Sequence, residues 1–95
     1  MTSRRPQYRT RRDENQAQII AELAQVPGFE VWDVSTLTDA QCPGDILVLD
    51  RATVRWGVFE IKTETGRPSK AQREMSDFVP IVRKTEDVLK WFGRI

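Results

Sequence analysis

The sequence of 95 residues contains no histidine and a single cysteine, Cys42. The absence of histidine excludes histidine acid–base catalysis, histidine-activated serine or cysteine nucleophiles, and histidine-ligated metals. One cysteine excludes an internal disulfide and a zinc site built from cysteines. No run of about 18 apolar residues is present, so we expect no membrane span and a cytoplasmic location. Any catalysis must therefore rest on carboxylates, lysine and water.

The net charge of +1 conceals an uneven distribution of charge along the chain. Residues 1–12 contain five arginines and no acid, and the remainder holds 15 − 5 = 10 basic and 14 acidic side chains, a charge of −4. Residues 1–11 are polar and poor in aliphatic side chains, which predicts a flexible basic arm before a single domain of residues 12–95. Such an arm is typical of nucleic-acid-binding proteins, although a solubilising tail has the same composition. The arginines that would bind nucleic acid are Arg4, Arg5, Arg9, Arg11 and Arg12.

Apolar residues with helical spacing follow the arm. They predict a helix from Asp13 to Val26, in which Asp13 and Glu14 oppose the positive end of the helix dipole and Pro27-Gly28 ends the helix. The apolar positions on this helix are Ala17, Ile20, Leu23 and Ala24, with Ile19 beside them.

Three predicted strands come next. Residues 29–34 alternate between apolar and polar side chains, and residues 46–50 form a continuous apolar run that is typical of a strand buried on both faces. Residues 54–62 read as a strand that pairs with residues 46–50 as a hairpin. Asp50 lies where the chain turns between them.

The C-terminal third predicts a helix, a strand and a second helix. Ser69 is a candidate N-cap for a helix over residues 70–78, and Gln72 has the spacing of a capping box. Residues 80–84 suggest a short strand, and Thr85 is a candidate N-cap for a last helix that ends at Gly93. The expected order is α-β-β-β-α-β-α, with an antiparallel meander and a fourth strand that runs parallel to a neighbour.

Two carboxylates and a lysine are expected at one end of this sheet. Asp45 follows the Pro43-Gly44 turn, and Glu60 and Lys62 share one face of the partner strand. Two carboxylates placed so closely require a cation, and Mg²⁺ takes one or two carboxylates together with water and substrate phosphate. Lys62 would stabilise charge that grows on a phosphate. On a solvated strand face, however, glutamate and lysine are ordinary residues.

The residues Gly-Asp, fourteen intervening residues and Glu-Ile-Lys resemble the signature of PD-(D/E)XK nucleases. In addition, "GRPSKAQ" resembles the serine–glutamine segment of the VRR-NUC (virus-type replication-repair nuclease) branch, and "NQAQII" resembles its opening helix. The resemblance spans residues 13–92. It implies a restriction-endonuclease-like α/β core of α-β-β-β-α-β order, with a mixed central sheet flanked by helices and, here, a short C-terminal helix.

The resemblance also implies an activity: hydrolysis of phosphodiester bonds by a Mg²⁺-dependent DNA endonuclease in which Mn²⁺ can substitute. Its catalytic residues would be Asp45, Glu60, Lys62 and Gln72, and its metal ligands Asp45, Glu60 and the main-chain carbonyl of Ile61. Gln72 has a second interpretation, as the closing residue of the Ser69 capping box.

One position departs from the family pattern. Gln16 stands where the family has an acidic residue in its opening helix. Asp13 or Glu14 could take that role from the preceding turn, or Gln16 could orient a water.

The resemblance further implies a branched DNA substrate such as a Holliday junction, a homodimer, and a bacterial or phage-infected cell. Two alternatives remain open, a nucleic-acid-binding module of the same fold with weak or no catalysis, and an RNA endonuclease. Arg67, Lys70 and Arg73 flank the predicted site, where they would grip phosphates or form a solvated surface.

Overall fold

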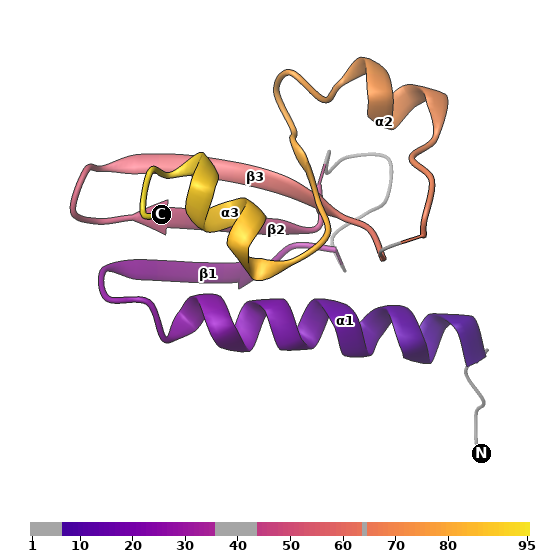
Figure 1. The fold of residues 1–95 in the computed structure, drawn as a ribbon, viewed down its shortest axis with the longest axis horizontal. Helices are drawn as coiled ribbons and strands as arrows, with labels where there is room; N and C mark the ends of the chain where they lie inside the picture. The colour runs from indigo at the N-terminus through magenta and orange to yellow at the C-terminus, as the bar shows by residue number, and fades with distance from the viewer. Residues whose placement is uncertain (1–6, 36–43, 64) are drawn as a thin grey trace.

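The computed structural model describes residues 7–35, 44–63 and 65–95 of the chain, and the backbone alone for residues 7–14. Three helices and four strands follow one another in these ranges in the order α-β-β-β-α-β-α (Figure 1). Their bounds are α1 Gln7–Ala24, β1 Phe29–Asp33, β2 Ile46–Asp50, β3 Arg55–Ile61, α2 Lys70–Glu74, β4 Ile81–Val82 and α3 Thr85–Trp91.

The four strands form one mixed sheet in the order β1-β2-β3-β4. Strands β1, β2 and β3 pair antiparallel, with Val31 opposite Val48 and Val48 opposite Gly57. Strand β4 pairs parallel with β3 through Glu60 and Ile81. The prediction of an α/β fold with a mixed sheet, an antiparallel meander and a parallel fourth strand is therefore confirmed.

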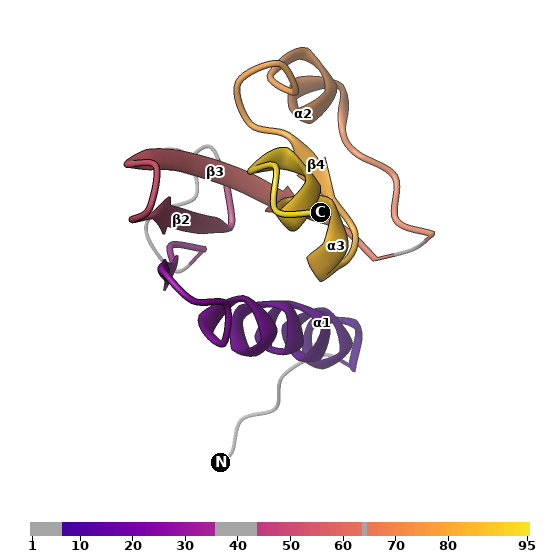
Figure 2. The ribbon, with the colours of Figure 1, turned by 60° about the vertical axis from the view of Figure 1, so that its left-hand side comes forward.

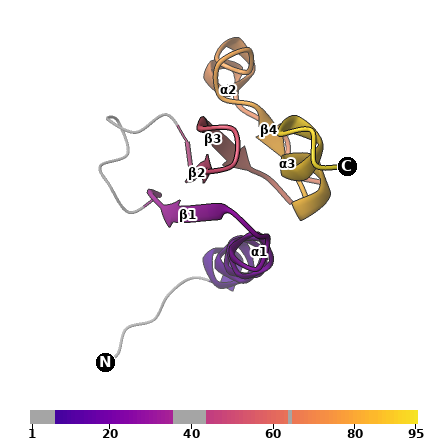
Figure 3. The ribbon, with the colours of Figure 1, turned by 90° about the vertical axis from the view of Figure 1, so that its left-hand side faces the viewer.

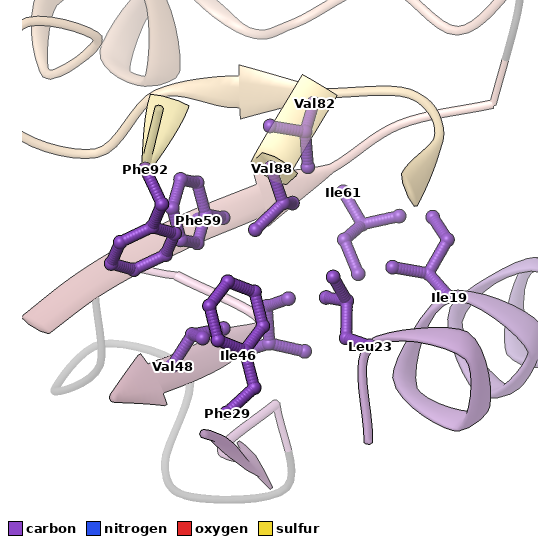
Figure 4. Packing of buried hydrophobic residues seen from close by; sticks show 10 residues of the cluster. All are labelled: Ile19, Leu23, Phe29, Ile46, Val48, Phe59, Ile61, Val82, Val88 and Phe92. Carbon is purple, nitrogen blue, oxygen red and sulfur yellow. The ribbon is translucent and has the colours of Figure 1, made fainter. Parts of the chain in front are cut away.

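Helices α1 and α3 supply the cover of one sheet face, while α2 lies at the opposite end of the molecule from α1 (Figures 2 and 3). Side chains from both covering helices meet the inward-facing side chains of the strands in one cluster (Figure 4). Its buried members are Ile19, Leu23, Phe29, Ile46, Val48, Phe59, Ile61, Val82, Val88 and Phe92. The aromatic rings of Phe29, Phe59 and Phe92 make tilted contacts at centroid distances of 5.1 and 5.9 Å.

The other sheet face is more open than the sequence predicts. Along β2, Ile46 and Val48 are fully buried, whereas Leu47 and Leu49 are only half-buried. The expectation of a strand buried on both faces is wrong, because both covering helices pack on the same side. Trp32 lies opposite Leu47 and Trp56 opposite Leu49, and the two indoles stack with centroids 5.8 Å apart while remaining exposed.

Helix α1 begins earlier than predicted. It starts at Gln7, so residues 7–11, which the sequence analysis assigns to the basic arm, are helical. Gln and Arg are good helix formers, and the apolar face that follows allows the helix to extend through them. Asp13 and Glu14 consequently lie beyond the first turn, where the helix dipole has little effect on them.

The buried stripe of α1 also differs from the predicted one. Ile19 and Leu23 are buried, whereas Ala17 and Ala24 are exposed. The helix turns the face that carries Ile19 and Leu23 toward the core instead of the face that carries the two alanines. Burying these larger side chains removes more apolar area from water.

The later elements have different ends from the predicted ones. Helix α2 ends at Glu74 rather than at residue 78, and β4 contains only two of the five predicted residues. The N-cap of α3 is Lys84, whose N–H donates to Asp87 Oδ2 at 3.2 Å. The Thr85 hydroxyl does not cap the helix, because it donates to Glu22 Oε1 on α1.

The C-terminal residues are tied to the β1–β2 end of the sheet by an ion pair between half-buried Arg94 and buried Asp50. Arg94 Nη2 donates to Asp50 Oδ1 at 3.0 Å and to the Pro27 carbonyl at 2.9 Å. Asp50 also accepts the Ala52 N–H, so it is a turn residue as predicted and an ion-pair partner as well. The hydrogen bond from Arg94 lowers the pKa of Asp50, whose side chain is only 1% exposed.

Candidate active site

Asp45 is fixed between two strands by three hydrogen bonds. Its N–H donates to the Phe59 carbonyl at 2.8 Å, and its carbonyl accepts the Val34 N–H at 2.9 Å. Its carboxylate turns toward β3, where Oδ2 accepts the Ile61 N–H at 2.9 Å. The side chain is therefore held against the strand that carries Glu60, with the residue 5% exposed.

Gly44 permits this close approach. A Cβ at this position would lie 2.6 Å from Val58 Cγ1 and 3.0 Å from the Phe59 carbonyl oxygen. Any larger residue would push the chain away from β3, so steric constraint explains why a glycine precedes Asp45.

Glu60 and Lys62 point away from the core. They alternate with Phe59 and Ile61, both of which belong to the buried cluster. Lys62 Nζ lies 3.7 Å from Glu60 Oε2, and Glu60 is 6% exposed. A carboxylate that is so little exposed requires positive or hydrogen-bonding partners, and Lys62 is one of them.

The side-chain amide of Gln72 makes hydrogen bonds to two places, the N-cap of its own helix and the Glu60 carboxylate. Its Oε1 accepts the Ser69 N–H at 2.9 Å, and Ser69 Oγ accepts the Gln72 N–H at 3.1 Å, which together form the predicted capping box. Its Nε2 donates to Glu60 Oε2 at 2.8 Å. The cap therefore aims the amide at the carboxylate, and the two interpretations of Gln72 are compatible.

Three separate segments thus bring Asp45, Glu60, Lys62 and Gln72 to one end of the sheet. Extension of the β2–β3 register places Asp45 opposite Glu60, because Ile46 pairs with Phe59. The group contains two carboxylates, one amine and one amide. These are groups that can bind a hard cation and a phosphate.

The donor set fits Mg²⁺. Asp45, Glu60 and the Ile61 carbonyl offer only oxygen ligands, and Mg²⁺ in proteins usually takes one or two carboxylates and keeps several waters. Among the described residues no group of three or more histidine, cysteine, aspartate or glutamate side chains gathers to hold a metal.

Gln16 contacts the end of β1, next to Val34, whose N–H donates to the Asp45 carbonyl. Its Nε2 donates to Asp33 Oδ1 at 2.9 Å and to Ser35 Oγ at 3.0 Å, and the residue is 6% exposed. It thus ties α1 to the end of β1, and none of its hydrogen bonds joins it to Asp45 or Glu60. The side chains of Asp13 and Glu14 lie outside the described part of the chain.

The predicted phosphate contacts divide into two groups. Arg67, Lys70 and Arg73 are exposed on and before α2, next to the segment that carries Gln72, and Arg73 Nη1 donates to the Pro68 carbonyl at 3.0 Å. Arg4 and Arg5 lie outside the described residues, as do the side chains of Arg9, Arg11 and Arg12.

Two residues near the site, Asp33 and Arg83, make contacts that the sequence analysis does not predict. Asp33 accepts hydrogen bonds from Gln16 and from both the N–H and the hydroxyl of Ser35. Arg83 Nη1 donates to the carbonyls of Thr63 and Gly66 at 2.5 and 2.7 Å. The Asp-Val-Ser spacing could have indicated the local turn at Asp33, but no short motif indicates contacts that span 17 to 20 residues.

Comparison of the chain with protein-family models, curated proteins and solved structures finds no match. Across the described ranges, no helix has the combination of length and apolar character needed to cross a membrane.

Proposed function

We propose that this protein is a metal-dependent endonuclease of the PD-(D/E)XK class, similar to its VRR-NUC branch, with a restriction-endonuclease-like core. The observation that carries the proposal is the convergence of Asp45, Glu60, Lys62 and Gln72. Lys62 Nζ and Gln72 Nε2 approach the same oxygen, Glu60 Oε2, at 3.7 and 2.8 Å. The element order and the mixed sheet agree with that fold class.

Each residue has a distinct role in the proposed reaction. Asp45, Glu60 and the Ile61 carbonyl would hold Mg²⁺, which supplies polarisation of the phosphoryl oxygen and a lower pKa of the attacking water. Lys62 stabilises the negative charge that develops on the phosphate. Gln72 orients the Glu60 carboxylate through its hydrogen bond. The products would carry a 5′-phosphate and a 3′-hydroxyl.

The substrate proposal is DNA, with branched DNA such as a Holliday junction as the preferred form. Cutting two strands of a branched substrate requires two active sites, so we also propose a homodimer with two-fold symmetry. Sedimentation equilibrium tests the dimer directly, since a mass near 11.0 kDa at all concentrations contradicts it.

The decisive experiment uses a matched panel of linear, flapped and four-way DNA, with RNA of the same sequences. Each substrate is incubated with Mg²⁺, Mn²⁺ or EDTA. We expect cleavage of DNA with either metal, fastest for the four-way substrate, and none with EDTA. Binding to DNA without cleavage in either metal contradicts the enzyme and favours a binding module of this fold, and cleavage of RNA alone favours the RNA endonuclease.

A further inference from the structure

Helix α2, which carries Gln72, is not held in place by a packed core. It spans Lys70–Glu74 and has no buried residue. Its position over Glu60 therefore depends on hydrogen bonds and on the chain at both of its ends. After the helix the chain reaches the buried residue Val79, and the Pro80 carbonyl accepts the Glu60 N–H at 2.9 Å. Before the helix, the chain passes through Thr63 and Gly66, which follow Lys62 in the sequence.

One side chain from another element holds these two residues. Arg83 Nη1 donates to the carbonyls of both Thr63 and Gly66, and the Gly66 N–H closes the turn on Thr63 at 3.1 Å. A cationic donor bonded to two carbonyls is a strong restraint on the backbone.

Arg83 is itself anchored in the rigid part of the fold. Its N–H donates to Asp87 Oδ2 on α3 at 2.8 Å, and the preceding Val82 carbonyl accepts the Lys62 N–H at 2.9 Å. Val82 is buried in the core cluster. A continuous chain of contacts thus runs from α3 through Arg83 to the turn, with Lys62 on one side of it and the Ser69 cap on the other.

We infer that Arg83 is a positioning residue for the candidate active site, which holds the backbone at Thr63 and Gly66 and thereby sets Lys62 and Gln72 relative to Glu60. This inference rests on the proposed function. The hydrogen bonds of Arg83 to the Thr63 and Gly66 carbonyls act on the backbone, which is why we assign it a positioning role.

The test combines amide hydrogen exchange with kinetics in Arg83→Met, which keeps the unbranched apolar stem of the side chain and removes its donors. Exchange of the Gly66 and Ser69 amides should become about tenfold faster or more, while exchange at Arg51, whose N–H donates to Gly28 at the far turn, stays unchanged. Unchanged exchange at Gly66 would overturn the inference whether or not the protein cleaves DNA. Absence of cleavage by the wild type would overturn the proposed function but leave this measurement valid.

Kinetics then separate positioning from phosphate binding. Arg83→Met should lower kcat by about tenfold to a hundredfold with KM nearly constant, the scale expected when reacting groups are misplaced by about 1 Å. A raised KM with unchanged kcat would instead identify Arg83 as a phosphate contact. Arg51→Met, at the opposite end of the sheet, is the matched control and should leave both constants unchanged.

A double-mutant cycle with Gln72→Ala completes the argument. If Arg83 acts through Gln72, kcat of the double variant should be no lower than kcat of the less active single variant. Independent, multiplying losses would contradict the inference. Arg83→Lys retains a charged donor and should fall between wild type and Arg83→Met in exchange and in kcat, so it serves if Arg83→Met does not fold.

Discussion

At the scale of single residues, Gln16 occupies the position at which the resemblance leads us to expect an acid. Its amide donates to Asp33 and Ser35, and those contacts require an N–H that glutamate lacks. Here the glutamine is a structural link between α1 and β1.

Gln16→Glu should therefore destabilise the protein. It removes a buried donor and sets a second carboxylate against Asp33, which should cost about 1–3 kcal/mol at neutral pH. Urea unfolding measures the change. Ala17→Glu adds the same charge at an exposed neighbouring position of α1 and should shift stability by less than about 0.5 kcal/mol. Equal effects of the two variants would show that the contacts of Gln16 do not matter.

The ion pair of Asp50 with Arg94 predicts how stability depends on pH. Arg94 lowers the pKa of Asp50 in the folded protein, so this carboxyl stabilises the fold above its ordinary pKa and ceases to do so as the pH falls through the folded pKa. Arg94→Met should lower the midpoint of unfolding at pH 7, and its deficit relative to wild type should shrink below about pH 4. A deficit of the same size at pH 3 and pH 7 would show that the pair does not act through charge.

At the scale of elements, the turn between β2 and β3 contains a strained residue. Val54 has a φ of 56°, which β-branched residues rarely adopt, and the residue is 75% exposed. Asparagine tolerates this conformation, so Val54→Asn should raise the free energy of unfolding by about 1 kcal/mol. Ala52→Asn changes the same turn at a residue without a positive φ and should give no gain. Thermal unfolding of both variants distinguishes relief of strain from a general benefit of asparagine.

The elements also show what sequence alone could predict. Alternation and hairpin spacing placed β1, β2 and β3 within one residue of their ends, and the capping-box spacing placed Ser69 and Gln72 correctly. Both signals arise from neighbouring residues. The choice of Lys84 over Thr85 as the N-cap of α3 depends on Glu22, which is 63 residues away and attracts the threonine hydroxyl.

In the candidate site, too, the contacts set by neighbouring residues could be predicted from the sequence and the long-range contact could not. Asp45, Glu60 and Lys62 could be brought together from strand pairing, because register is a local property of a short hairpin. The clamp of Arg83 on Thr63 and Gly66 could not, because it depends on the path of α2 and β4 around the end of the sheet.

At the scale of the whole molecule, the basic N-terminal residues should affect the affinity for DNA more than the rate of the cleavage step. Replacing Arg4, Arg5, Arg9, Arg11 and Arg12 by glutamine should weaken binding to every DNA sequence alike. The slope of log affinity against log salt should become shallower by about 0.9 for each arginine that contacts a phosphate. Fluorescence anisotropy across a salt series measures this slope. An unchanged slope would mean that these arginines do not touch DNA.

The central claim is that Asp45, Glu60 and Lys62 form one catalytic site. Single-turnover cleavage of a four-way DNA junction across a Mg²⁺ titration tests it most directly, with circular dichroism to verify that each variant folds. Asp45→Asn, Glu60→Gln and Lys62→Met should each lower the rate by about a hundredfold or more, the scale for losing one group that stabilises the transition state. Cleavage by Asp45→Asn at the wild-type rate would contradict the account.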